Sequence, residues 1–380
     1  MSSQRIGIIG GGQLAWMMAG AAEKLGVKLI VQTPKSDDPA VAIADDVIFA
    51  PVDDATATAE LAKRADVITF ENEFINLEAL MALSQEGIQF RPRLEALAPL
   101  LDKYDQRRYL KDIGLPVPEF VALDTPTKTE SPFGFPVVLK ARRHGYDGQG
   151  TFILKSQDEL EDTWKPQQAA PMLLEGFVPF ERELAVMAAR SVTGEVVVYP
   201  VVETQQEDQV CRRVLIPANV SDAVNSQVEA IAHNLLNALD VVGIFGIELF
   251  LTQEGKVLVN EIAPRTHNSG HYTLDACEVS QFEMQLRAVS GLPLPSPTLK
   301  SAGAVMVNLL GYEYSESEYL EKREQIAAIP NAHLYWYGKS ESRPGRKLAH
   351  VTILLDSTDI SHAKAIGNQI ESIWYGSDQV

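Results

Sequence analysis

A chain of 380 residues exceeds a single ordinary folding unit and predicts two or three domains, with room for a cleft between them. The hydrophobic fraction of 46% and the charged fraction of 22% indicate a globular protein, and no stretch approaches the roughly 20 apolar residues that span a bilayer. The net charge of −18 argues against binding nucleic acid or an anionic membrane through a broad positive field. An anionic substrate would therefore need a local basic cluster or a metal ion.

The N-terminus and the cysteines both indicate a reducing cytoplasm. Met1–Arg5 is short and polar and lacks the long apolar run of a secretory signal. Cys211 and Cys277 lie far apart without CxxC spacing, which indicates neither a disulfide framework nor a thiolate zinc site. We therefore expect a cytoplasmic protein.

Strands and helices alternate over about the first 100 residues, which predicts a parallel, Rossmann-like α/β sheet. A helix is expected after the glycines at 10–12, from the apolar spacing of the residues that follow. The other elements expected here are strands at Arg5–Ile9, Lys28–Gln32, Asp46–Ala50 and Asp66–Phe70 and helices at Ala55–Lys63 and Leu77–Gln85.

The chain changes character near Gly114. One helix is predicted over Leu94–Ile113, and Pro116 and Pro118 then open a new segment. Strands dominate beyond this point, which predicts a small α+β lobe. Its expected strands are Val137–Lys140, Thr151–Lys155, Met172–Glu175, Leu184–Arg190 and Val196–Val202.

The remainder predicts a central sheet layer and a small C-terminal unit. Ser221–Leu239 has the apolar spacing of a helix and leads into strands at Phe245–Leu251 and Lys256–Ile262. The proline-rich stretch Pro293–Pro297 indicates a linker. The C-terminal strands are expected at Ala304–Leu309 and Lys347–Leu355.

The first glycine cluster fits the pattern GxGxxA through Gly10, Gly12 and Ala15, between a strand and a helix. A dinucleotide site would also need an acid about 20 residues further on, where this chain has Gln32. Three interpretations remain open: a nicotinamide dinucleotide site, a structural tight turn, and a turn that contacts a substrate.

A second glycine cluster spans 140–151, with Lys140 at the end of a strand and Gly145, Gly148 and Gly150 close together. Backbone amides of such a loop can approach phosphate oxygens, and a lysine supplies a fixed positive charge to the same phosphates. The alternative is an ordinary hairpin loop.

Two glutamates, Glu248 and Glu261, lie on consecutive apolar strands. With Glu254 and Gly255 as a two-residue turn, the simplest hairpin register pairs these two residues directly. Like charges so placed destabilise a sheet unless one is protonated or a cation lies between them, and magnesium bridging nucleotide phosphates would serve. The alternative is two unrelated, solvated glutamates.

The second of these strands ends in the polar sequence 260–271, which contains an arginine, two histidines and two asparagines. So many hydrogen-bonding groups after a core strand indicate a site. Near the C-terminus, Lys339, Arg343, Arg346 and Lys347 form a basic cluster in an acidic protein. We interpret it as a phosphate-binding cluster, with a solvated surface as the alternative.

In this order the motifs resemble the ATP-grasp superfamily. Within it, GGGQL at 10–14, GYDGQG at 145–150 and NEIAPRTHNSGH at 260–271 are similar to the N5-carboxyaminoimidazole ribonucleotide synthetase family. The resemblance implies an N-terminal preATP-grasp domain over 1–102, an ATP-grasp domain over 103–295 with its glycine-loop lobe at about 116–190, and a small C-terminal domain over 296–380. It also implies an ATP- and Mg²⁺-dependent ligase that carboxylates 5-aminoimidazole ribonucleotide with bicarbonate in purine synthesis.

The resemblance assigns roles to individual positions. The metal ligands would be Glu248 and Glu261, and the residues near the reacting groups would be Tyr146, Asp147, Arg265, Asn268 and His271. ATP would contact Lys103, Lys140, Gly145, Tyr146, Asp147, Gly148, Gln149, Gly150, Thr151, Glu175, Gly176, Phe177, Val178, Glu183, Gln206, Asn260 and Glu261. The ribonucleotide and bicarbonate would contact Gln13, Leu14, Glu73, His267, Asn268, Lys339, Arg346 and Lys347.

The family pattern further implies a homodimer whose product passes to the N5-carboxyaminoimidazole ribonucleotide mutase. The chain departs from that pattern at Ala15-Trp16, at Gln206 and at Ala263. Three other activities stay open: a formate-dependent glycinamide ribonucleotide transformylase, a nicotinamide-dependent oxidoreductase, and a module that binds ATP without consuming it.

Overall fold

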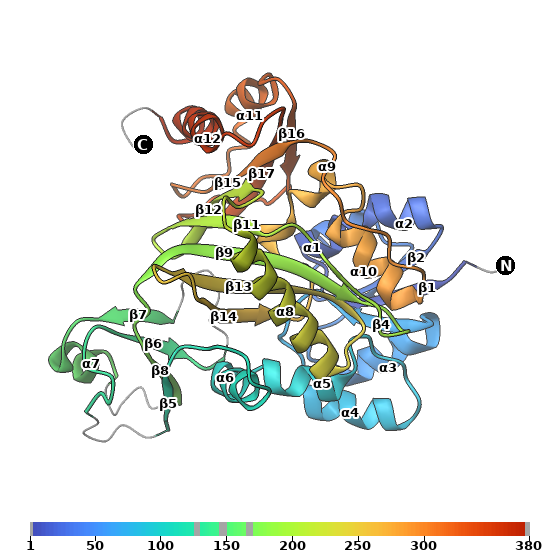
Figure 1. Cartoon of the computed structure of the whole chain (residues 1–380). Coiled ribbons are helices and arrows are strands. Elements are labelled where there is room, and N and C mark those ends of the chain that lie inside the picture. Colours follow the sequence, from blue (N-terminus) through green and yellow to red (C-terminus); the bar gives the residue numbers. More distant parts are fainter. Residues whose placement is uncertain (1–2, 125–129, 144–149, 165–169, 377–380) are drawn as a thin grey trace.

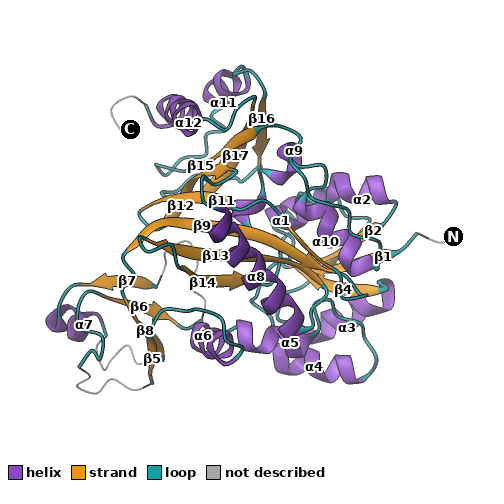
Figure 2. Ribbon diagram, in the orientation of Figure 1, coloured by secondary structure: helices purple, strands orange, loops and turns teal. Residues whose placement is uncertain are grey.

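The computed structural model describes residues 3–124, 130–143, 150–164 and 170–376. Three β-sheets organise this part of the chain, with the largest sheet crossing the middle of the molecule (Figures 1 and 2). None of the described helices is long and apolar enough to cross a membrane.

The N-terminal sheet is parallel, as predicted, and its strand order is β3-β2-β1-β4. The helix expected after the glycines is divided into α1 and α2, which are separated by Met17 and Met18. The strands are β1 (Arg5–Ile9), β2 (Lys28–Thr33), β3 (Asp46–Phe49) and β4 (Val67–Phe70). The helices are α1 (Gln13–Trp16), α2 (Ala19–Leu25), the short η1 (Pro39–Ala42), α3 (Ala55–Arg64) and α4 (Leu77–Gln85).

The prediction of a single helix over Leu94–Ile113 is wrong. The segment forms three pieces: α5 (Leu94–Leu97), η2 (Ala98–Leu100) and α6 (Lys103–Asp112). Asp102 begins the last piece, because its side chain accepts hydrogen bonds from the backbone amides of Tyr104 and Asp105. An N-cap of this kind starts a new helix, and it directs α6 toward the smaller lobe.

The smaller lobe is a four-stranded antiparallel sheet of order β5-β8-β6-β7, covered by α7 (Gln157–Thr163). Its strands are β5 (Phe120–Leu123), β6 (Val137–Ala141), β7 (Thr151–Leu154) and β8 (Met172–Gly176). Strand β9 (Phe180–Arg190), which we expected in this lobe, instead belongs to the large sheet, where it pairs with β13 along nearly its whole length. The chain therefore leaves the lobe directly after β8.

The large sheet has nine strands, with the main order β14-β13-β9-β11-β12-β15-β17-β16 and β10 paired to β9. The single strand predicted over Val196–Val202 is two strands, because Pro200 lies between them. The strands not yet placed are β10 (Val196–Val198), β11 (Val202–Glu207), β12 (Val210–Ile216), β13 (Gly243–Thr252), β14 (Val257–Ala263), β15 (Gly303–Leu310), β16 (Ala332–Trp336) and β17 (Lys347–Leu355).

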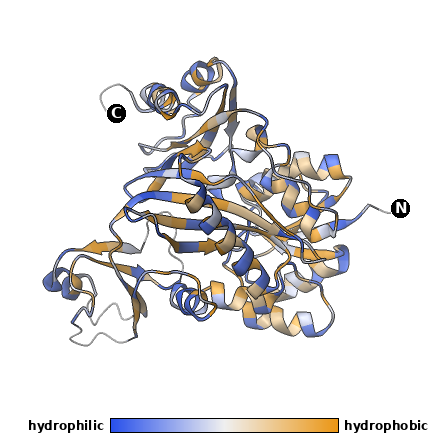
Figure 3. Ribbon diagram, in the orientation of Figure 1, coloured by the Kyte–Doolittle hydropathy of each residue, from blue (hydrophilic) through white to orange (hydrophobic). Residues whose placement is uncertain are grey.

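Helices cover this sheet. The predicted helix at Ser221–Leu239 is confirmed as α8 (Asp222–Leu239), whose apolar face packs on β9 and β13. Figure 3 shows hydrophilic and hydrophobic residues alternating along α8, as a helix that buries one face requires. Helices α9 (Thr273–Ala276) and α10 (Gln281–Ser290) lie between the large sheet and the N-terminal layer.

The C-terminal unit continues the large sheet through the pairing of β12 with β15. Helices α11 (Leu320–Ala327) and α12 (Ile360–Tyr375) pack on its strands around the fully buried Trp374. The large sheet therefore runs without a break from β14 into the C-terminal unit. A cleft lies on it, between the smaller lobe, the N-terminal layer and the C-terminal loops.

Candidate active site

The cleft has a volume of about 1930 Å³ and is lined from all parts of the chain. Almost every described residue that the sequence predicted for the site lines it: Gln13, Leu14, Glu73, Lys103, Lys140, Thr151, Glu175, Gly176, Phe177, Val178, Glu183, Gln206, Glu248, Asn260, Glu261, Arg265, His267, Asn268, Lys339, Arg346 and Lys347. Gly145, Tyr146, Asp147, Gly148 and Gln149 lie outside the described residues. Gly150 and His271 are described but do not line the cleft.

The predicted carboxylate pair is present: Glu248 on β13 lies directly opposite Glu261 on β14. The route to this register differs from the prediction. The loop between the strands is closed by Thr252 and Lys256 and so holds three residues, which shifts the pairing by one. A bulge at Asn260 shifts it back, so the two differences cancel at the carboxylates.

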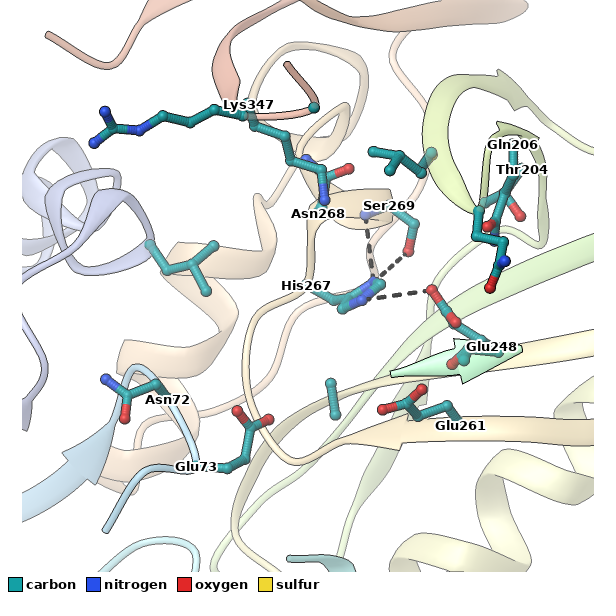
Figure 4. A pocket seen from close by; sticks show the side chains of 18 of the residues that line it. Asn72, Glu73, Thr204, Gln206, Glu248, Glu261, His267, Asn268, Ser269 and Lys347 are labelled. Atoms are coloured by element: carbon teal, nitrogen blue, oxygen red, sulfur yellow. Dashed lines mark hydrogen bonds and ion pairs between the residues drawn. The ribbon is translucent and has the colours of Figure 1, made fainter. Parts of the chain in front are cut away.

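Burial and the neighbouring charges set these two carboxylates apart. Burial, and then the charge of Glu261, raise the pKa of Glu248 to about 7. Burial also acts on Glu261, but Lys103, whose Nζ lies 2.7 Å from Oε2, outweighs it and lowers the pKa of that carboxyl. Figure 4 shows the two side chains next to each other. Hard oxygen donors that repel each other in this way fit a divalent cation, which would favour the ionised form of both.

A third carboxylate, Glu183, extends the acidic end of the cleft. It lies on β9, and burial followed by the charge of Glu248 raises its pKa to about 7. A hydroxyl-rich ligand such as a ribose could donate hydrogen bonds to it.

A buried cluster of three charges lies where α6, the smaller lobe and β14 meet. Glu175 forms an ion pair with Lys140 at 2.7 Å and accepts a hydrogen bond from Nε of Arg107 at 2.6 Å. Burial opposes ionisation of Glu175, but Arg107 and Lys140 prevail and hold its pKa at about 2. Lys140 also donates to the Asn260 side chain at 3.1 Å, which orients its ammonium toward the carboxylate pair.

Sequence reasoning missed Arg107. It lies inside α6 on a segment that reads as an ordinary polar helix, although its side chain is only 3% exposed. Besides Glu175, it donates to the backbone carbonyls of Val259 at 2.7 Å and Asn260 at 2.8 Å. It therefore satisfies the carbonyls at the bulge that places Glu261.

The first glycine cluster forms a turn around a buried carboxylate. A Cβ at Gly12 would lie 2.4 Å from an oxygen of Glu71, and the amide of Leu14 donates to the same oxygen at 3.3 Å. Burial raises the pKa of Glu71, which follows β4 directly and was not identified from the sequence. A carboxylate thus occupies the helix start where a dinucleotide would place its pyrophosphate. The dinucleotide interpretation is not supported, and the glycines are required by the turn.

Two motifs far apart in the sequence meet at the other end of the cleft. Glu73, just after β4, lies 3.0 Å from Nε of Arg265, which follows β14. The charge of Glu73 is the first of several that outweigh burial and raise the pKa of Arg265. An arginine held in this way presents a fixed positive charge to an anion.

The polar loop after β14 divides between the cleft and the core. His267 faces the cleft, with its Nε2 at 3.6 Å from Glu248 and its Nδ1 at 2.9 Å from the Ser269 hydroxyl (Figure 4). Asn268 exchanges two hydrogen bonds with the buried Asn308. His271, which we expected near the reacting groups, is fully buried, and burial lowers its pKa well below the usual range. It does not line the cleft, contrary to that expectation.

The predicted basic cluster is arranged on the far wall of the cleft. Lys339 donates to the backbone carbonyl of Lys347 at 2.6 Å, and Arg346 donates to that of Glu341 at 2.7 Å. These two bonds to backbone carbonyls orient the cations of Lys339 and Arg346 on this wall. The wall can therefore hold a phosphate.

The chain matches three family models along its length. They are the ribonucleotide synthetase preATP-grasp domain over residues 3–99, the ATP-grasp domain over 108–282, and the phosphoribosylaminoimidazole carboxylase C-terminal domain over 304–364. Among curated proteins, the N5-carboxyaminoimidazole ribonucleotide synthase of Synechococcus elongatus is 55% identical, over 99% of this chain and 96% of that protein.

Solved structures give the same result. The N5-carboxyaminoimidazole ribonucleotide synthetase of Thermotoga maritima is 41% identical, with a TM-score of 0.87 over 97% of this chain and 98% of that one. The synthase of Aspergillus clavatus, solved with ADP and 5-aminoimidazole ribonucleotide, is 31% identical, with a TM-score of 0.91 over 100% and 99% of the two chains. The chain therefore belongs to the N5-carboxyaminoimidazole ribonucleotide synthase family, with the preATP-grasp, ATP-grasp and C-terminal domains of that family.

Proposed function

We propose that the chain catalyses the ATP-dependent carboxylation of 5-aminoimidazole ribonucleotide by bicarbonate, which gives N5-carboxyaminoimidazole ribonucleotide, ADP and phosphate. This is a carbon–nitrogen ligase step of purine synthesis. The observation that carries the proposal is the directly opposed pair Glu248 and Glu261, flanked by Lys103 and Lys140, in a family member whose cleft also presents a basic wall.

ATP would lie between the smaller lobe and the large sheet. The strand end at 175–178 would contact the adenine, Glu183 the ribose, and Lys103 and Lys140 the phosphates. Glu248 and Glu261 would hold Mg²⁺, which when bound neutralises phosphate charge during phosphoryl transfer. Lys140 is held by Glu175 and Asn260, so its charge needs no reorganisation as the reaction proceeds.

The chemistry consists of two displacements. A bicarbonate oxygen attacks the γ-phosphorus of ATP, ADP leaves, and carboxyphosphate forms. The exocyclic amine of the ribonucleotide then takes the carboxyl group, directly or as carbon dioxide, while phosphate leaves and the amine loses a proton. Arg265, paired to Glu73, would hold the bicarbonate, with His267 and Asn268 beside it. Tyr146 and Asp147 remain predicted participants outside the described residues.

The ribonucleotide phosphate would bind Lys339, Arg346 and Lys347, so Arg346→Ala should raise the KM for 5-aminoimidazole ribonucleotide. A charged hydrogen bond to phosphate supports an increase of roughly 10- to 100-fold. Steady-state kinetics measures this, and the KM for ATP serves as the internal control because ATP lies at the other end of the cleft. Equal increases in both constants would remove the phosphate role.

Cation binding should depend on pH through Glu248, whose pKa is raised to about 7. Below that value the carboxyl holds a proton that a cation must displace. We expect the apparent dissociation constant of Mg²⁺, measured calorimetrically with a non-hydrolysable ATP analogue, to rise about tenfold for each pH unit below about 7 and to level off above it. In Glu248→Gln the slope should become shallower, and a pH-independent affinity in the parent protein would contradict the assignment.

The substrates are small molecules, and we infer that the protein works in the cytoplasm as a homodimer whose product passes to the N5-carboxyaminoimidazole ribonucleotide mutase. Family membership supports this inference. Analytical ultracentrifugation across a range of concentrations tests the dimer, and a monomer at all of them would overturn it.

The decisive assay is ADP release with ATP, magnesium and bicarbonate. Stimulation by 5-aminoimidazole ribonucleotide alone is expected. A parallel reaction with formate and glycinamide ribonucleotide tests the transformylase activity of the same superfamily. Stimulation there, or ADP release in neither reaction, would overturn the proposal.

A further inference from the structure

Gln281, the first residue of α10, forms two hydrogen bonds to the backbone of His267 from outside the cleft. Its side chain is fully buried and does not line the cleft. Its Oε1 accepts a hydrogen bond from the amide of His267 at 2.9 Å, and its Nε2 donates to the carbonyl of the same residue at 2.8 Å. One side chain thus holds both backbone groups of a residue that faces the carboxylate pair.

The same amide fixes the state of His271. A backbone N–H can only donate and a carbonyl can only accept, so the two bonds to His267 determine which end of the Gln281 amide is nitrogen. That nitrogen lies 3.0 Å from Nδ1 of His271, which must therefore be the acceptor. His271 is then neutral with its proton on Nε2, in agreement with its complete burial. Both hydrogens of the Gln281 amide are used.

Two glycines leave the space that this arrangement requires. A Cβ at Gly270 would lie 2.6 Å from the Gln281 oxygen, and a Cβ at Gly246 would lie 2.5 Å from the Cβ of His267. Thr273 also supports the loop, because its hydroxyl accepts a hydrogen bond from the backbone N–H of Gln281 at 2.8 Å and donates one to the backbone carbonyl of Gly270 at 2.6 Å. The loop is therefore held against β13 and α10 together.

We infer that Gln281 is a positioning residue for the reaction. It acts through His267, whose ring points toward Glu248 with Nε2 3.6 Å from the carboxylate (Figure 4). If the backbone at this position moved, the imidazole would move relative to the carboxylate pair and to the part of the cleft where bicarbonate and the amine would meet. The inference rests on the proposed function, because it concerns the rate of that reaction.

The chain provides a matched control on the same helix. Gln285, one turn further along α10, is also buried. Its Oε1 accepts from the amide of Ile244 at 2.7 Å, and its Nε2 donates to the hydroxyl of Thr69 at 2.8 Å. Removing either glutamine side chain therefore removes buried hydrogen bonds from α10, but only Gln281 bonds to the loop that carries His267.

The experiment compares Gln281→Met with Gln285→Met. We expect Gln281→Met to lower kcat/KM for 5-aminoimidazole ribonucleotide by about 10- to 100-fold, as for other residues that orient a group at a reacting centre. Gln285→Met should lower the melting temperature but leave kcat/KM close to that of the parent. Equal kinetics in the two variants would refute the inference, and an inactive parent would instead refute the proposed function.

A double-mutant cycle with His267→Ala separates positioning from general weakening of the fold. If Gln281 acts through His267, Gln281→Met should have little further effect in the His267→Ala background. Losses that multiply would overturn the inference. Should Gln281→Met fail to fold, Gln281→Glu keeps the size and one acceptor but cannot make both donations, and the same cycle applies. Parental kinetics in Gln281→Glu would also count against the role.

Discussion

Replacing Glu261 by glutamine is expected to lower the rate of ADP release by about 10²- to 10³-fold, the usual effect of removing one group that stabilises charge in a transition state. Glutamine keeps the size of the side chain but removes the negative charge opposite Glu248. The pair would then offer one ionisable carboxylate to a cation instead of two, and Lys103 would lose its partner at 2.7 Å. Steady-state ADP release at saturating ATP measures the effect.

Folding should survive this change. The substitution removes a like charge that raises the pKa of Glu248, and Glu248 remains near Lys103 to balance it. Glu254→Gln is the matched control, because Glu254 lies in the loop that joins the same two strands and is exposed. Parental activity in Glu261→Gln, or an equal loss in Glu254→Gln, would contradict the assignment of the metal site.

The sequence predicted best those elements whose periodicity is strong and local. The parallel N-terminal sheet follows from alternating strands and helices, and α8 from the regular apolar spacing between Val224 and Leu235. Strands β11 and β12 were not predicted, because polar residues such as Gln205 and Arg213 interrupt any apolar pattern. Such strands form because neighbours on both sides supply hydrogen bonds, and those neighbours are distant in the sequence.

The site residues show the same contrast between local sequence patterns, which can be predicted, and contacts between distant segments, which cannot. Arg265 was predicted because a motif concentrates polar residues around it, and the carboxylate pair was predicted from the register of a local hairpin. Arg107 and Gln281 were missed because each lies in an ordinary helix and gains its role only through a tertiary contact. His271 was placed at the site because it closes a motif, but its motif gives no information on burial. A sequence pattern therefore reveals the reactive groups more easily than it reveals the residues that hold those groups in place.

Arg107→Met is expected to lower the free energy of unfolding by about 3 to 5 kcal/mol, the usual cost of removing one partner from a buried ion cluster. The variant loses bonds to Glu175 and leaves the carbonyls of Val259 and Asn260 without their donor. Urea denaturation measures the loss. Arg108→Met is the control, because the neighbouring Arg108 is 60% exposed and its contacts are a surface ion pair with Asp105, which contributes about 1 kcal/mol or less, and the ring of Tyr104.

Arg107→Met should also change the pH at which acid unfolds the protein, and the direction of that change follows from the pKa of Glu175. Its pKa of about 2 is depressed from 4.5, so its ionisation stabilises the fold above about pH 4.5, and that stability is lost as the pH falls toward 2. Without Arg107 the pKa should rise, and the midpoint of acid unfolding should move to higher pH. Where the variant is still folded, ADP release should also fall, because the bulge that places Glu261 opposite Glu248 has lost its support. Lower stability with parental turnover would show that β14 keeps this bulge without Arg107 and would restrict the arginine to a role in stability.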